Sequence, residues 1–193
     1  MANEYCTVAE VKSRLDITDN ANDTEIAGVI EAVSRAIDTD RGRVFYTATA
    51  TRYYSPRWDD YLLIDDCQSV TTLQSDEDGD GTFETTWTED TDFFLMPFTG
   101  PPYDQIVLTT NGNYTFPIFN RSVKITGVFG YSATTPPAIR EACILASMRV
   151  WKRRDVLFGT AGNAELGTIE AIAPIMRDGE LSLLLDTVER SIV

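Results

Sequence analysis

The sequence predicts an α+β fold: a helical bundle formed by N- and C-terminal helices, with a small antiparallel β-domain inserted between them. Apolar residues near both ends recur at the helical period, whereas the period changes to two from residue 45 to 132. The flanking helices need each other to bury their apolar stripes, which places the β-rich segment as an insertion. We therefore expect N-terminal helices at 1–44, a β-rich lobe at 45–132, a helix completing the helical lobe at 133–158, and a glycine-rich linker with a C-terminal helix at 159–193.

Two helices are predicted in the N-terminal segment. Thr7 and Glu10 have the spacing of a capping box, in front of a short helix that runs through Leu15. A longer helix follows, capped by Asp23 and ended near Gly42. The apolar residues spaced to fill one face of this second helix are Ile26, Val29, Ile30, Val33 and Ile37.

The middle of the chain contains six runs with strand character. They are YTATATRYYS, SVTTLQ, GTFETTWT, DFFLM, QIVLTT and VKITGVFGYS, separated by Asp, Gly, Asn and Pro. Asn111-Gly112 is a strong tight-turn signal between the last two. Short strands at this regular spacing are typical of a small antiparallel sandwich or barrel.

A third helix is predicted after Pro136 and Pro137, which suit a first helical turn. Its apolar face consists of Ile139, Ala142, Cys143, Ala146 and Val150. Three basic residues complement the dipole at its C-terminal end, namely Lys152, Arg153 and Arg154. A final helix from about Gly179 has an apolar stripe of Leu181, Leu184, Leu185, Val188 and Ile192.

Composition excludes several function classes. A net charge of −14, from 16 bases and 30 acids, argues against binding nucleic acid phosphates across the whole surface. Without histidine there is no Ser-His-Asp triad, Cys-His pair or histidine metal ligand. Three distant cysteines, Cys6, Cys67 and Cys143, fit reduced, buried thiols better than a disulfide framework. With no signal-peptide pattern and no apolar run of about 20 residues, we expect a soluble protein made inside a cell, without a membrane partner.

The stretch DEDGDG is the one candidate metal site. Asp76, Asp78, Asp80 and Gly81 match the first half of a calcium-loop template. The twelfth position, where an EF-hand has a bidentate Glu, is Trp87, and the flanks are not helical. The stretch therefore has two interpretations: a polar hairpin turn, or the same turn holding a weak, structural Ca²⁺ ion. No cofactor is required under the first.

Three further groups of residues have competing interpretations. The basic cluster Lys152, Arg153 and Arg154 is either a solvated helix end or a patch for an acidic partner or a local phosphate. Carboxylates at Asp59, Asp60, Asp65 and Asp66 could imitate a glycosidase pair, but a solvated loop explains them as well. The aromatic residues Tyr5, Tyr53, Tyr54, Trp58, Tyr61 and Trp87 could form a sugar platform, although such residues in strands usually pack a core or an interface.

Several stretches, in this order, resemble one known family. The N-terminal YCTVAEVKSRLDIT and the helix DTEIAGVIEAVSRAIDTDRGRVF are similar to the start of head–tail connector (adaptor, or head-completion) proteins of long-tailed bacteriophages. The segment VKITGVFGYSATTPPAIREACILASMRVWKRRDVLFG resembles the later helix of that family. SVTTLQSDEDGDGTFETTW is like the hairpin that larger members insert between these blocks. Together the matches cover most of residues 5 to 159.

The resemblance implies a non-enzymatic virion protein at the head–tail interface, assembled in the host cytoplasm. Such proteins form a homo-oligomeric ring of about twelve copies beneath the portal protein. The ring extends the channel for passing genomic DNA, without sequence-specific binding, and provides the platform for the next neck or tail (stopper) protein. Carried over to this chain, the portal-facing candidates are Lys152, Arg153, Arg154, Phe158, Leu181, Leu184, Leu185, Val188 and Ile192.

Two other functions stay open. One is a calcium-stabilised β-module that binds carbohydrate or a host surface, as in a tail fibre or a capsid decoration protein. The other is a hydrolase that uses paired carboxylates, which would need a cleft between Asp or Glu residues.

Overall fold

The computed structural model describes residues 3–110, 112–154 and 179–188 of the chain. Three sequence-based predictions therefore lie outside the described residues. They concern Asn111 in the predicted tight turn, Phe158 and Ile192 among the partner candidates, and the glycine-rich linker.

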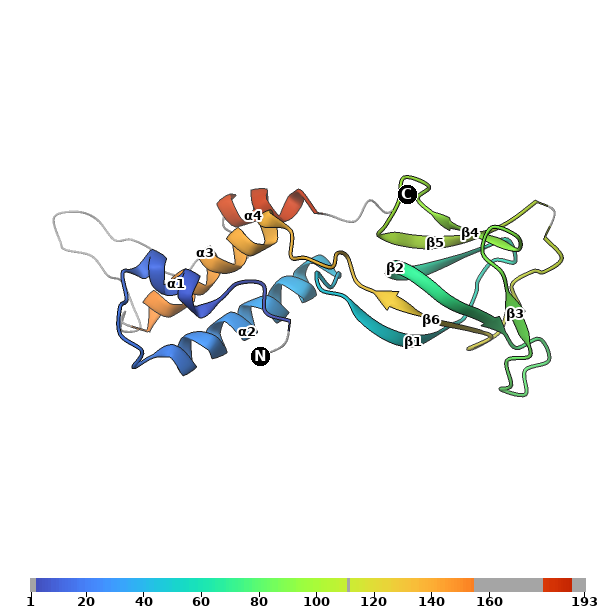
Figure 1. Cartoon of the computed structure of the whole chain (residues 1–193), viewed down its shortest axis with the longest axis horizontal. Coiled ribbons are helices and arrows are strands. Elements are labelled where there is room, and N and C mark those ends of the chain that lie inside the picture. Colours follow the sequence, from blue (N-terminus) through green and yellow to red (C-terminus); the bar gives the residue numbers. More distant parts are fainter. Residues whose placement is uncertain (1–2, 111, 155–178, 189–193) are drawn as a thin grey trace. The chain divides into compact units, whose positions relative to one another are not determined.

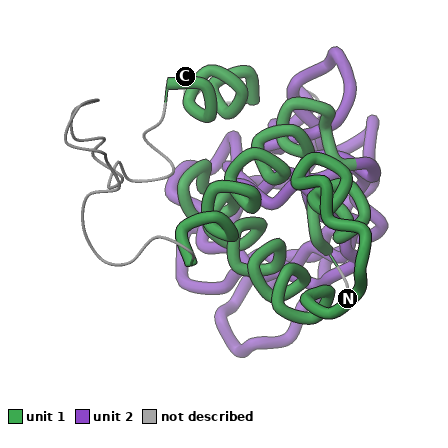
Figure 2. The backbone as a smooth tube through the Cα atoms, turned by 90° about the vertical axis from the view of Figure 1, so that its left-hand side faces the viewer, with its two compact units in different colours: residues 1–42, 135–193 green, residues 43–134 purple. Residues whose placement is uncertain are grey.

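The chain divides into two compact units, coloured separately in Figure 2. The helical unit comprises Met1–Gly42 and Thr135–Val193, and the β unit comprises Arg43–Thr134. The sequence predicts these boundaries at 44/45 and 132/133. The α+β class is confirmed, and the residues of the β unit form one continuous stretch inserted in the sequence of the helical unit; Figure 1 labels the helices and strands of both.

Helix α1 (Val8–Leu15) begins at the predicted capping box. The Thr7 side chain accepts a hydrogen bond from the Glu10 amide at 3.3 Å, and the Glu10 carboxylate accepts one from the Thr7 amide at 2.9 Å. Two amides that a free helix end leaves unpaired are satisfied in this way. The helix ends at Asp16, whose φ of 56° is left-handed.

Helix α2 (Asp23–Arg41) corrects one prediction. Its N-cap is Asn22, and Asp23 is the first helical residue. The Asp23 carboxylate instead forms an ion pair with Lys12 of α1, with Nζ and Oδ1 2.6 Å apart. At the other end Gly42 is the C-cap with φ of +60°, as predicted, because glycine enters this region without a steric penalty.

Helices α3 (Pro137–Arg153) and α4 (Gly179–Asp186) complete the helical unit. Helix α3 contacts α1, α2 and α4, and it lies alongside α2 in Figure 1. Its buried residues are Ile139, Ala142, Cys143, Ile144, Ala146, Ser147 and Trp151, which confirms the predicted face except at half-buried Val150. No helix among the described residues combines the length and apolar character that crossing a membrane requires.

The β unit forms one antiparallel sheet among the described residues. Its six strands are β1 (Ala48–Tyr54), β2 (Tyr61–Ser75), β3 (Thr85–Trp87), β4 (Phe93–Met96), β5 (Tyr103–Leu108) and β6 (Val123–Phe129). The order is β1-β6-β2-β5-β4, and β3 pairs with β2. All six predicted runs contribute a strand, so the period of two identified the strands but not the order in which they pair.

Strand β2 has 15 residues, whereas the predicted run SVTTLQ has six, because the strand already begins at Tyr61. Its first half pairs with β5 and its second half with β6, with shifts in register at bulges. Gly127 of β6 lies where a Cβ atom would collide with the Ser69 carbonyl oxygen on β2. The bulged strand can approach β6 this closely only because that position has no side chain.

One apolar core holds the β unit together. It consists of Leu62, Ile64, Cys67, Leu73, Trp87, Phe93, Leu95, Ile106, Phe116, Val123, Ile125 and Phe129. Trp87 stacks on Phe116 with ring centroids 4.8 Å apart, and its indole nitrogen donates to the buried Ser75 hydroxyl at 2.9 Å. The Trp87 ring is therefore buried with its polar atom satisfied.

Candidate functional site

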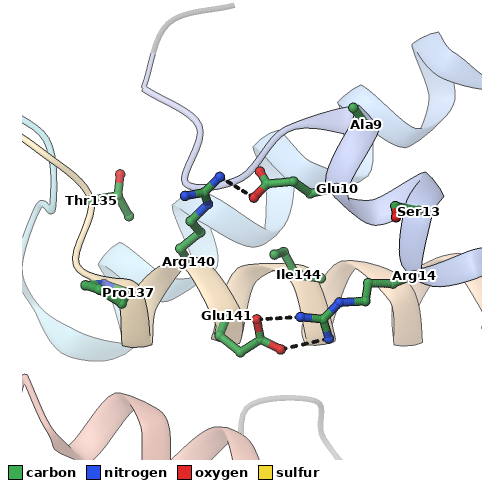
Figure 3. A pocket seen from close by; sticks show the side chains of 9 residues that line it. All are labelled: Ala9, Glu10, Ser13, Arg14, Thr135, Pro137, Arg140, Glu141 and Ile144. Carbon is green, nitrogen blue, oxygen red and sulfur yellow. Dashed lines mark hydrogen bonds and ion pairs between the residues drawn. The ribbon is translucent and has the colours of Figure 1, made fainter.

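An open groove of about 590 Å³ lies between α1 and α3 in the helical unit (Figure 3). The residues that line it are Ala9, Glu10, Ser13, Arg14, Thr135, Pro137, Arg140, Glu141 and Ile144. Its charged side chains come from helices that are separated by the whole β unit in sequence. No local pattern indicates such a groove, and the sequence analysis missed it.

Two ion pairs cross this groove, as Figure 3 shows. Arg140 pairs with Glu10, and Arg14 pairs with Glu141 through two N···O distances of 3.0 Å. Burial alone would raise the pKa of Glu10, but hydrogen bonds from Thr7 and the nearby Arg140 charge lower it below its ordinary value. The Arg14 and Glu141 side chains are 50% and 36% exposed, so the pair contributes little to folding and remains accessible to a partner.

The predicted basic cluster lies at the end of α3, where Lys152, Arg153 and Arg154 are all exposed. Arg154 pairs with Glu25 of α2 at 3.4 Å, and its guanidinium carbon lies 3.5 Å from the centroid of the buried Trp151 ring. One member of the cluster therefore links α3 to the start of α2. Lys152 and Arg153 keep the accessibility that a partner contact would need.

Helix α4 packs its apolar stripe against α3 rather than presenting it to solvent. Leu181 and Leu185 are fully buried and Val188 is 7% exposed, whereas Leu184 is half-buried. The exposed leucine is Leu183, at 71%, which the sequence analysis did not select. Ion pairs of Arg149 with Glu180 and of Arg41 with Asp186 flank the stripe. A partner role for Leu181, Leu185 and Val188 stays a prediction, and it requires α4 to leave α3.

The structure brings the three predicted calcium-loop acids together in the turn after β2. One carboxylate oxygen from each of Asp76, Asp78 and Asp80 lies within 4.8 Å of the others. The buried Asp76 accepts backbone hydrogen bonds from Gly79 at 2.7 Å and Gly81 at 2.9 Å, and both glycines have positive φ.

The other two acids also close the turn on itself. Asp78 accepts from the Asp80 amide, and Asp80 accepts from the Thr82 amide, which lowers the pKa of Asp80. These bonds are what a polar hairpin turn needs. The carboxylate oxygens that accept these bonds each keep a second lone pair that could bind a cation. Ca²⁺ binding at this turn stays a prediction.

Two of the four candidate hydrolase acids, Asp65 and Asp66, are bound to arginines rather than to each other. Asp65 and Asp66 lie in β2 rather than in a loop, which corrects the solvated-loop interpretation for these two. Asp66 is buried because Arg43 binds it through two hydrogen bonds of 2.8 Å. Asp65 pairs with Arg52 at 2.5 Å and accepts from the Tyr54 hydroxyl at 3.1 Å. Each of these two carboxylates is therefore bound to an arginine instead of to a second acid.

The candidate sugar-platform aromatics are dispersed. Tyr5 is buried in the helical unit and Trp87 in the β core, which confirms the core interpretation for both. Trp58, 41% exposed, stacks on Tyr61 with centroids 4.5 Å apart, beside a pocket of about 230 Å³ that the exposed Leu63 also lines. Of the six candidates, Trp58 and Tyr61 are the two whose rings stack on each other at the surface.

No protein-family model and no curated protein matches this chain. Solved structures do. A chain in the neck of an empty gene transfer agent (GTA) particle computed with C6 symmetry is 18% identical, with a TM-score of 0.60 over 96% of this chain and 90% of that one. A chain in the neck of a native GTA particle computed with C12 symmetry is 17% identical, with a TM-score of 0.60 over 96% and 89%. One in the virion of a native GTA particle is 17% identical, with a TM-score of 0.62 over 96% and 90%.

These similarities establish the fold. They span both the helical unit and the β unit, since they cover 96% of the chain. The resemblance predicted from sequence, to proteins of the head–tail interface, is thereby supported at the level of fold: the same arrangement of helices and inserted sheet occurs in particle necks.

Proposed function

We propose that this chain is a structural protein of a virus-like particle neck, a ring-forming head–tail adaptor that docks beneath the portal and supports the next neck component. The observation that carries this proposal is the similarity, over nearly the full length of both chains, to a neck protein in a particle computed with C12 symmetry. A shared small domain could serve many functions, but here the β insertion and the helices around it match together.

The charge of the chain suits a ring around DNA. A ring of about twelve copies carries a formal charge near −170, before screening by counterions. If part of this charge lines the bore, DNA phosphates meet like charge and are not retained at any one place. The adaptor would therefore let the genome pass without sequence-specific binding.

The basic end of α3 is the proposed portal-facing surface. Lys152 and Arg153 are exposed and adjacent in a chain whose net charge is strongly negative. Local positive charge on an acidic protein orients it toward an acidic surface of a partner. The exposed side of α4, with Leu183, belongs to the same proposal because α4 packs against α3.

The test is co-sedimentation and negative-stain imaging of the purified full chain mixed with its portal protein. We expect rings, and a complex that Lys152→Glu/Arg153→Glu weakens at least tenfold. The matched control is Arg57→Glu/Lys124→Glu in the β unit, which changes the net charge equally and should bind like the unaltered chain. Absence of both rings and co-sedimentation would overturn the adaptor function. Equal weakening by both double variants would move the portal-facing surface elsewhere.

A second function is favoured by one observation, the exposed stack of Trp58 on Tyr61 beside its small pocket. Exposed aromatic faces of this kind bind sugar rings or aromatic side chains. A β-module that binds carbohydrate would make the full chain retain glycans on an array, with Trp58→Ala abolishing the signal. If the array retains no glycan, carbohydrate binding is contradicted, and the aromatic stack is better explained as a contact with another protein.

A further inference from the structure

Two of the three cysteines meet in the interior of the helical unit. Cys6 precedes α1 and Cys143 lies in α3, yet their sulfur atoms are 3.2 Å apart. Cys6 is 4% exposed and Cys143 is fully buried. Neither thiol has a part in the proposed neck function, so this pair is a feature of the chain that the function does not explain.

Two hydrogen bonds fix the residues just before Cys6 to α2. The Tyr5 amide donates to the buried Ser34 hydroxyl at 3.2 Å, and the Arg35 guanidinium donates to the Asn3 carbonyl at 2.7 Å. The Ser34 hydroxyl also lies 3.6 Å from the Cys143 sulfur. Because α2 and α3 pack together, these bonds hold the two thiols facing each other before any reaction occurs.

We propose that Cys6 and Cys143 are an oxidisable thiol pair that forms an intramolecular disulfide with a peroxide as oxidant, linking the N-terminal segment to α3. A disulfide bond is about 2.05 Å long, so the sulfurs need to approach by only about 1.2 Å. The inference depends on this geometry and not on the proposed neck function.

The chemistry assigns different roles to the two sulfurs. The Cys6 thiol donates a hydrogen bond to Cys143, which lowers the pKa of Cys143 and raises that of Cys6, and the nearby Ser34 hydroxyl adds to the lowering. The Cys143 thiolate is therefore the nucleophile. It attacks one peroxide oxygen, the O–O bond breaks, and hydroxide leaves, which gives a sulfenic acid on Cys143.

The second step closes the bond. Cys6 loses its proton, and its sulfur attacks the sulfur of Cys143 and displaces the sulfenic hydroxyl, which leaves as water. In sum, two thiols and one hydrogen peroxide give one disulfide and two waters. Because both thiols are buried, the peroxide reaches them when the short N-terminal segment opens locally, which costs less than unfolding the whole chain.

The third cysteine, Cys67, serves as an internal control for the specificity of disulfide formation. Cys67 lies in the β unit, its thiol donates to the Ser69 carbonyl at 3.2 Å, and burial raises its pKa to about 11. With three cysteines in the chain, an intramolecular bond has three possible pairings. Only the pairing of Cys6 with Cys143 joins sulfurs that the fold already brings together.

The test uses the purified full chain, treated with hydrogen peroxide both in the native state and during refolding from denaturant. Non-reducing peptide mapping should find the Cys6–Cys143 linkage as the main product, within a monomer. The product should survive Cys67→Ser and disappear in Cys6→Ser and in Cys143→Ser. The melting temperature should rise by about 5–15 °C and return after reduction, since the bond restricts the unfolded chain between residues 6 and 143. A dominant bond to Cys67, a bond between chains, or two thiols still reduced after both treatments would overturn the proposal.

Discussion

Each of the two units contains an arginine–carboxylate ion pair, buried in the β unit and exposed in the helical unit. In the β unit, Arg43 binds Asp66 through two hydrogen bonds, and both side chains are less than 10% exposed. In the helical unit, Arg14 binds Glu141 with the same two-point geometry, but the side chains are 50% and 36% exposed. The difference teaches that burial, not geometry, sets the cost of breaking such a pair. Loss of one partner leaves a buried charge uncompensated in the β unit, whereas water can solvate the remaining partner in the helical unit.

The units also differ in how the chain builds them. The β unit is one continuous segment around a single aromatic and aliphatic core. The helical unit joins residues from both ends of the chain, so the cost of closing a long loop is part of its folding. We therefore expect matched substitutions in the two units to change the free energy of unfolding by different amounts.

The largest effect is expected from Arg43→Met, which leaves Asp66 charged and buried without its partner. We expect a loss of about 3–5 kcal/mol in the free energy of unfolding, measured by urea denaturation. The double variant Arg43→Met/Asp66→Asn should recover much of this loss because the uncompensated charge is gone. Arg14→Met is the matched control in the helical unit and should cost less than about 1 kcal/mol. Equal losses for the two arginines would remove the contrast between buried and exposed pairs.

The next effect concerns α4, whose leucines are buried on α3. Leu185→Ala should lower the free energy of unfolding by about 2–4 kcal/mol if α4 belongs to the folded core of the free chain. Leu183→Ala, at the exposed position on the same helix, should change it by less than about 0.5 kcal/mol. If Leu185→Ala leaves stability unchanged but weakens portal binding, the α4 stripe acts on a partner instead.

A smaller effect, with a distinct pH dependence, is expected at the capping box. Thr7→Ala should cost about 1 kcal/mol because the Glu10 amide loses its side-chain acceptor. The pKa of Glu10 is lowered in the folded chain, so its carboxylate stabilises the fold above its ordinary pKa, and this contribution disappears as the pH falls through the lower, folded value.

Melting curves of the unaltered chain and of Glu10→Gln should therefore diverge at neutral pH and converge in acid. Curves that stay parallel down to strongly acidic pH would assign the pH dependence to other groups.

The smallest effect is expected from calcium at the acidic turn. If Asp76, Asp78 and Asp80 hold an ion, millimolar Ca²⁺ raises the melting temperature and a chelator lowers it, with a gain of about 1.4 kcal/mol at ten times the dissociation constant. Asp78→Asn should abolish the response, and Asp59→Asn should leave it intact. If Ca²⁺ and chelator leave the melting temperature of the unaltered chain unchanged, the turn binds no stabilising ion and is held by its backbone hydrogen bonds.

Sequence periodicity located most elements but not their exact extents. The capping box at Thr7 and the glycine stop at Gly42 are local, so they could be identified directly. The first half of β2 could not, because Asp65 and Asp66 interrupt its apolar pattern and are stabilised there by Arg52 and Arg43 from elsewhere in the chain. The candidate sites divide in the same way: the acidic turn is contiguous in sequence, whereas the groove between α1 and α3 is not.

By itself the sequence determined the α+β class, the inserted position of the sheet, and the acidic charge, because hydrophobic period and composition act over short distances along the chain. Only the tertiary structure decided that the six strands form one sheet, that the leucines of α4 are covered by α3, and that Cys6 meets Cys143. Those outcomes depend on which distant surfaces pack together. The identity and spacing of a cysteine or leucine do not indicate which residue it contacts in the folded chain.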